Sequence, residues 1–90
     1  MELNDYGVCA FRSRSQAYKF YDILKRAGLT VRIISSPKEI AVGCGISVRI
    51  ETAQLQRAVD IYKRNPPNAT VGFYRVQWAD GKAHIYPFKL

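Results

Sequence analysis

The order of hydrophobic and polar positions divides the chain into alternating strand and helix segments. Residues 5–11 carry aromatic and β-branched side chains in weak alternation, which predicts a first strand. Ser13 and Gln16 then form a capping-box signature, in which the Ser13 hydroxyl accepts from the Gln16 backbone N–H. Apolar residues follow at helical spacing and Gly28 supplies a stop, so a helix is expected over 15–27.

The middle of the chain repeats this order of elements. A β-branched run at 29–34 predicts a second strand, which Pro37 ends because proline lacks a backbone donor. Residues 46–51 alternate apolar and polar side chains, as a half-buried third strand does. Thr52 is a favoured N-cap residue for a second helix, which the prolines at 65–68 stop. The buried face of that helix is expected to hold Leu55, Ala58, Val59 and Tyr62.

The C-terminal segment is typical of a β-hairpin. Residues 70–78 predict a fourth strand, the Asp-Gly pair within 79–82 predicts a tight turn, and 83–88 return as a fifth strand. The first six elements match the β-α-β-β-α-β order of a ferredoxin-like sandwich. We therefore expect an α+β fold of that kind with a C-terminal hairpin strand. Its helices would cover one face of an antiparallel sheet, and the other face would stay open for a partner or a second copy.

Length and composition limit what such a chain can be. With 90 residues we expect a single domain over 1–90, too small for a large enclosed active site. Hydrophobic content of 48% and charged content of 23% are ordinary for a soluble domain. There is no apolar run of roughly 20 residues and no signal-peptide pattern in residues 1–11. A cytoplasmic protein with no membrane segment is expected.

The charge balance raises nucleic acid or an acidic protein as a partner. Fourteen Lys and Arg against seven Asp and Glu give a formal charge of +7. The basic residues are scattered along the chain without a block, which is typical of a solvated surface. Aromatic residues such as Tyr74 and Trp78 lack the Lys/Arg-Gly-aromatic pattern of RNA-recognition sheets. The sequence therefore favours partners other than nucleic acid. A small basic nucleic-acid-binding, regulatory or oligomerisation module without covalent chemistry is kept as the alternative function.

The candidate chemistry rests on two cysteines. Cys9 and Cys44 do not form a CxxC pair, and two cysteines without a secretion signal are typically reduced thiols. Together with the single histidine, His84, they cannot supply the roughly four ligands of a zinc site. We expect no metal and no cofactor. Cys9 lies in the first predicted strand and is interpreted as a small core residue rather than a resolving thiol.

Cys44 stands between two glycines, directly before the third strand. Gly43 and Gly45 leave space beside the sulfur and permit backbone conformations that turn N–H groups toward a thiolate. Lys38 and Arg32 carry positive charges that can lower a thiol pKa. By itself, the segment is also typical of a tight turn with a buried cysteine.

The surrounding residues resemble a known family. The resemblance extends over about residues 5–75 and includes the stretch 24–34. It is sharpest at Ser36-Pro37-Lys38-Glu39-Ile40 and at Gly43-Cys44-Gly45-Ile46, a Pro-basic-Glu-Ile motif followed after a short gap by Cys-Gly. It points to the putative selenium/sulfur carrier protein-like family of small bacterial proteins. In this chain the basic position is Lys38 where Arg is common, and residues 41–43 replace a more serine-rich stretch.

The resemblance implies a function for Cys44. It implies a sulfur or selenium carrier, not a true enzyme, whose Cys44 thiol accepts a persulfide or perselenide, with Gly43, Gly45, Lys38 and Arg32 in supporting positions. The partners would be a donor enzyme similar to a cysteine desulfurase and an acceptor protein, with a homodimer as an option. Such transfer is exchange between sulfur atoms and needs no metal or organic cofactor.

Overall fold

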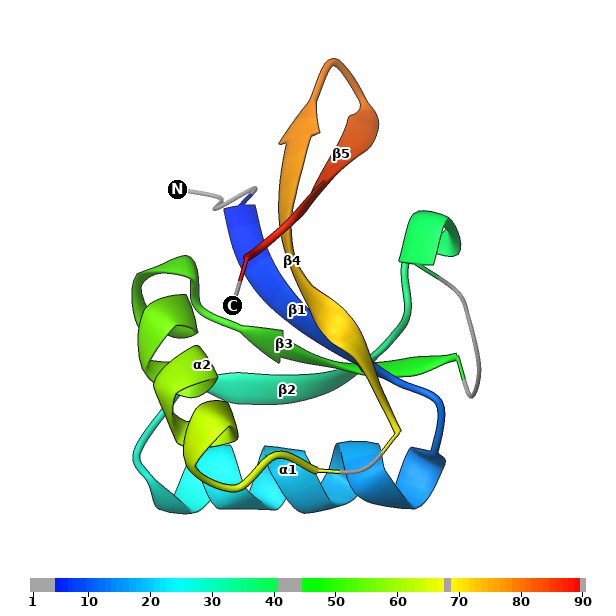
Figure 1. Ribbon diagram of the computed structural model, residues 1–90. Helices are drawn as coiled ribbons and strands as arrows, with labels where there is room; N and C mark the ends of the chain where they lie inside the picture. The colour runs from blue at the N-terminus through cyan, green and yellow to red at the C-terminus, as the bar shows by residue number, and fades with distance from the viewer. Residues whose placement is uncertain (1–4, 41–44, 68, 90) are drawn as a thin grey trace.

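A five-stranded antiparallel sheet carries two helices on one of its faces (Figure 1). The computed structural model describes residues 5–40, 45–67 and 69–89. Its elements, in chain order, are β1 (Asp5–Phe11), α1 (Arg14–Arg26), β2 (Val31–Ser35), the 3-10 turn η1 (Lys38–Ile40), β3 (Ile46–Ile50), the 3-10 turn η2 (Thr52–Gln54), α2 (Leu55–Arg64), β4 (Thr70–Ala79) and β5 (Lys82–Pro87).

The strands lie in the order β2-β3-β1-β4-β5, and every neighbouring pair is antiparallel. Strand β3 lies between β1 and β2, and β1 lies between β3 and β4, so each β-α-β unit is split by a strand of the other. The prediction of a mixed helix and strand fold with an antiparallel sheet is confirmed. The C-terminal hairpin is also present, as β5 pairs with β4 at the sheet edge.

Local signals set the first helix and the hairpin as expected. The Gln16 backbone N–H donates to Ser13 Oγ at 3.4 Å, and α1 begins one residue before the predicted start. At the hairpin tip, Asp80 and Gly81 have φ of +53° and +74°. Two positive φ values in a two-residue loop are the geometry that matches the twist of the flanking strands, which explains the Asp-Gly sequence.

The predicted N-cap of the second helix is wrong. Thr52 opens η2, a 3-10 turn closed by a 2.9 Å hydrogen bond from Gln54 N to Glu51 O, and α2 begins only at Leu55. The Thr52 hydroxyl is buried and has no hydrogen-bond partner among the described residues. The Gln54 side chain instead reaches across to accept from Thr30 N at 2.7 Å. The side-chain hydrogen bond at this helix start is therefore a tertiary contact, and no side chain caps the helix locally.

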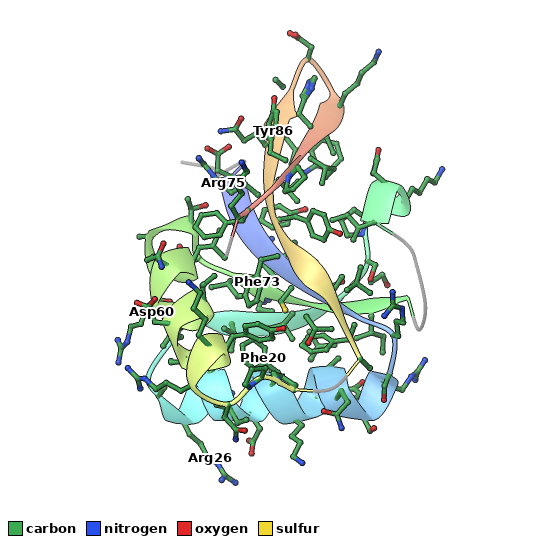
Figure 2. The ribbon with its side chains drawn as sticks, viewed as in Figure 1. Phe20, Arg26, Asp60, Phe73, Arg75 and Tyr86 are labelled. Carbon is green, nitrogen blue, oxygen red and sulfur yellow. The ribbon has the colours of Figure 1, made fainter. Side chains whose placement is uncertain are left out.

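The main core lies between the helices and the sheet. Phe20 of α1 and Phe73 of β4 (Figure 2) meet there edge to face, with ring centroids 6.1 Å apart. The ring centroid of Tyr62 on α2 lies 5.2 Å from that of Phe73. Such edge-to-face contacts contribute about 0.5–1.5 kcal/mol beyond area burial. The fully buried residues of this core include Cys9, Phe11, Leu24, Val48, Ile50 and Ala58.

The opposite face of the sheet is not left open, contrary to the prediction. Val8 and Ala10 alternate along β1 with core residues, so they point to the face without α-helices. There they form a second buried cluster with Val76 of β4 and Ile40 of η1, and Ile40 is only 3% exposed. The reason is that the chain after Pro37 turns back over the sheet and buries one apolar side chain on it. The middle of this face is thus covered by the protein itself.

Candidate functional site

The segment that carries the Pro-Lys-Glu-Ile motif is the connection between β2 and β3. Its base is closed by a 2.8 Å hydrogen bond from Ser36 N to Gly45 O. Beside it, Ser36 Oγ lies 2.6 Å from Ser47 Oγ, and Ser47 is fully buried. The two hydrogen bonds hold Ser36 and Gly45, the described ends of the connection, side by side at the sheet.

Within this connection the motif contains one buried residue, which acts as an anchor, and two exposed charged residues. Ile40 N donates to Pro37 O at 2.9 Å, which forms the η1 turn, and the Ile40 side chain is buried in the second cluster. Lys38 and Glu39 are exposed. The spacing of the motif therefore directs one apolar side chain to the sheet and two charged side chains to solvent.

Among the described residues of this connection, Gly45 has a backbone conformation that favours glycine. Its φ is +75°, a region that residues with a Cβ rarely adopt. A Cβ placed there would meet no heavy atom of the described residues within 4 Å, its chain neighbours aside. The position therefore favours glycine because of its backbone conformation. Gly43 and Cys44, the other predicted residues of this loop, lie outside the described residues.

Arg32, the second predicted basic residue, is not beside the loop base. It is exposed on β2 and pairs across the strands with Arg49 of β3. It precedes Ser35 by three residues, about 10 Å along the strand at roughly 3.3 Å per residue. Lys38 and Gly45 belong to the connection itself, whereas Arg32 lies farther along the sheet.

Cys9 is a core residue, as predicted. It has no exposed surface and belongs to the cluster between helices and sheet. Burial raises the pKa of the Cys9 thiol well above its ordinary value, because the thiolate would lose its hydration. A neutral thiol without solvent access cannot meet a partner's sulfur while the protein is folded.

A groove that the sequence analysis missed runs across the face without α-helices. It encloses about 590 Å³ between η1 and the β4–β5 hairpin, two elements that stand apart above β1 in Figure 1. We call it the hairpin groove, lined by Tyr6, Ser35, Pro37, Lys38, Glu39, Trp78, Gly81, Lys82 and Ala83. Its lining joins chain segments more than 70 residues apart, so no local sequence signal indicates it. Two aromatic side chains of the hairpin, Trp78 and Tyr86, are exposed, and Trp78 is the one that lines the groove.

The comparison with protein families gives the class of this domain. A family model described as putative Se/S carrier protein-like matches residues 6–74, which include β1 to β4 and the whole β2–β3 connection. The chain belongs to this family, and the resemblance seen in the sequence is confirmed. No curated protein and no solved structure matches the chain. Among the described residues, no helix has the length and apolar character needed to cross a membrane.

Proposed function

We propose that this protein carries sulfur or selenium as a persulfide or perselenide on Cys44. The observation that carries the proposal is the family match over residues 6–74, which spans the Pro-Lys-Glu-Ile motif and Cys44. The described neighbours of Cys44 are compatible with the role. No described residue faces the Cβ side of Gly45, and the hydrogen bond from Ser36 N to Gly45 O holds the base of the loop.

The proposed step is a thiol–persulfide exchange. The Cys44 thiolate attacks the terminal sulfur of a persulfide on a donor enzyme similar to a cysteine desulfurase. One S–S bond forms on Cys44 while the donor's S–S bond breaks, and the donor cysteine leaves as a thiolate. The exchange involves no net oxidation or reduction, so it needs no added oxidant or reductant. The same exchange in reverse delivers the sulfur to a thiolate of an acceptor protein, and selenium follows the same route as a perselenide.

The supporting residues act on access and charge. Lys38 is exposed in the loop and is proposed to favour the Cys44 thiolate over the thiol. Arg32 is proposed to add a weaker effect from the sheet surface, because screening reduces the interaction of exposed charges beyond roughly 10 Å. Gly43 and Gly45 are proposed to leave room for the partner's sulfur on both sides of Cys44.

Further assignments belong to this proposal. The protein is a carrier rather than an enzyme, it acts in the cytoplasm with donor and acceptor proteins, and its 90 residues form one domain. We infer that β1 to β4 with both helices form a ferredoxin-like sandwich, because each β-α-β unit is split by a strand of the other. β5 extends the sheet beyond that unit.

Mass spectrometry of the intact protein tests the carrier role. The protein is incubated with a cysteine desulfurase and cysteine, and one added sulfur atom is expected. The Cys44→Ser variant should gain none, whereas Cys9→Ala should gain the same single atom, since Cys9 is inaccessible. A parallel reaction with selenocysteine and a lyase that releases selenium from it tests the perselenide. Sulfur addition that persists in Cys44→Ser would refute the assignment.

A charge variant tests how Lys38 contributes. Lys38→Gln should slow loading at neutral pH and move the pH profile of loading to higher pH, because the thiolate loses a neighbouring cation. Lys63→Gln on α2 removes the same charge from an exposed position on another element and should leave the profile unchanged. Equal effects of the two variants would assign the change to net charge and not to Lys38.

A further inference from the structure

We propose that the hairpin groove binds a nucleotide unit of a single-stranded nucleic acid. The base would stack on Trp78, and the flanking phosphates would bind Lys38 and Lys82. The inference does not depend on the carrier role, because none of these contacts involves a thiol, although both proposals use Lys38. The sequence discounted nucleic acid because its basic residues are scattered, but the fold brings several of them to one face.

The size and lining of the groove fit a planar group with attached anions. Its volume of about 590 Å³ lies in the range of ligand sites, roughly 300–1,000 Å³. Lys38 lies on η1 and Lys82 on β5, so the two ammonium groups come from opposite walls. Neither lysine forms an ion pair with any other residue that the structure describes. Glu39 is the single acidic side chain of the lining, and the two lysines outnumber it.

The groove contains an exposed aromatic surface. Trp78 Nε1 donates to the Tyr6 hydroxyl oxygen at 3.5 Å, a long hydrogen bond that places the indole beside Tyr6. Trp78 nevertheless remains 46% exposed. A large apolar ring held open to solvent on a 90-residue protein is a stacking surface available to any base. An acidic peptide would satisfy the lysines but would leave this ring unused.

Positive charge continues beyond the groove, which favours a strand over a free nucleotide. The Arg49 guanidinium lies 4.2 Å from the centroid of the Tyr6 ring. Arg32 is its cross-strand neighbour on the same face. These arginines line a second hollow of about 230 Å³ together with Thr30 and Glu51. A backbone leaving the groove over Tyr6 would therefore meet two further cations.

Anisotropy of a labelled, mixed-sequence single-stranded RNA tests the proposal. Trp78→Ala should weaken binding about tenfold, the low end of the effect of one stacked base. Tyr18→Ala is the matched control, because Tyr18 is also 46% exposed but lies on α1. The Tyr18→Ala variant should bind the RNA with the affinity of the parent protein. Trp78 is the only tryptophan of the chain, so its fluorescence should also be quenched when unlabelled RNA saturates the protein.

Salt dependence separates the lysines from the net charge. Lys38→Gln with Lys82→Gln should reduce the slope of log affinity against log salt by about 1.4, at about 0.7 per phosphate contact. Lys19→Gln with Lys63→Gln removes the same charge from the helices and should leave the slope unchanged. Equal effects of the two pairs, or no RNA binding at low salt, would overturn the proposal.

Two competitors exclude other occupants of the groove. A nucleoside monophosphate should displace the RNA only weakly, because it lacks the second phosphate and the contacts beyond Tyr6. Oligoglutamate should also compete poorly, since it provides charge without a planar ring. If the monophosphate competes as well as the unlabelled RNA, the site is a small-molecule pocket. If oligoglutamate competes as well as the unlabelled RNA, the site binds acidic peptides. Either result would refute the assignment.

Discussion

Ser36 N donates a 2.8 Å hydrogen bond to Gly45 O, which joins the two ends of the connection that contains Cys44. At this point Gly45 has a φ of +75°, so the hydrogen bond depends on a backbone conformation that glycine adopts freely. The geometry of the loop base is therefore linked to the residue type next to the proposed carrier cysteine.

Substitution of Gly45 tests this link. Gly45→Ala should lower the free energy of unfolding by about 1–2 kcal/mol, the cost of a left-handed conformation for a residue with a Cβ. The described residues add no steric clash, since none of their atoms lies within 4 Å of the new Cβ, its chain neighbours aside. Gly45→Asn should lose less, because asparagine tolerates this region. Urea unfolding of the parent protein and of both variants measures these free energies.

A matched glycine separates stability from reactivity. Gly81 at the hairpin tip has a similar φ of +74° and is equally open. Gly81→Ala should therefore cost about as much stability as Gly45→Ala, within the same 1–2 kcal/mol. Only Gly45→Ala should change the alkylation rate of Cys44. A change of that rate in both variants would mean that it follows global stability instead of the loop geometry.

Elements with local signals were predictable from the sequence, and elements set by distant contacts were not. The Ser13 and Gln16 pair and the Asp80-Gly81 turn contain their own hydrogen bonding or backbone preference. Thr52 has the same local signal, but a contact between Gln54 and Thr30 moves the helix start. Local pattern alone could not reveal which competing contact prevails.

The candidate site shows the same limit. The resemblance over about residues 5–75 was sufficient to identify the family, which the match over residues 6–74 confirms, because such a resemblance is a property of the sequence itself. That Ile40 closes the second core could not be predicted, since residues 37–45 have no clear periodicity. The hairpin groove depends on the register that brings Trp78 next to Tyr6, which only the folded sheet determines.

Truncation of the anchor tests whether η1 is held by its single buried side chain. Ile40 is 3% exposed, so Ile40→Ala should lower the free energy of unfolding by about 2–4 kcal/mol. Glu39→Ala at the exposed neighbouring position should change it by less than about 0.5 kcal/mol. Urea unfolding of both variants measures the difference. Equal, small losses would show that η1 does not depend on packing against the sheet.

The two cysteines should differ in reactivity. In the folded protein iodoacetamide should modify Cys44 at least about tenfold faster than Cys9, whose thiol is buried with a raised pKa. Peptide mapping by mass spectrometry after short exposures measures both rates. In urea the two rates should converge, because unfolding removes the burial of Cys9. Protection of Cys44 equal to that of Cys9 in the folded state would contradict the carrier proposal.

The raised pKa of Cys9 predicts how stability depends on pH. The folded protein keeps the Cys9 thiol protonated at a pH where the unfolded chain, with a thiol pKa of about 8.5, has lost that proton. This contribution to stability is fully present below the unfolded pKa and is lost as pH rises above it. The slope is about 1.4 kcal/mol per pH unit until the folded pKa is reached.

Cys9→Ala isolates this contribution from the other titrating groups. The variant should be less stable at neutral pH by about 1 kcal/mol, because it leaves a small cavity in the core. Above about pH 8.5 the difference in free energy of unfolding between parent and variant should narrow with rising pH, since only the parent protein has the Cys9 thiol. Urea unfolding between neutral pH and moderately alkaline pH measures the gap. A constant gap over that range would mean that the Cys9 thiol ionises equally well in the folded and unfolded chains, which full burial in an apolar core does not permit.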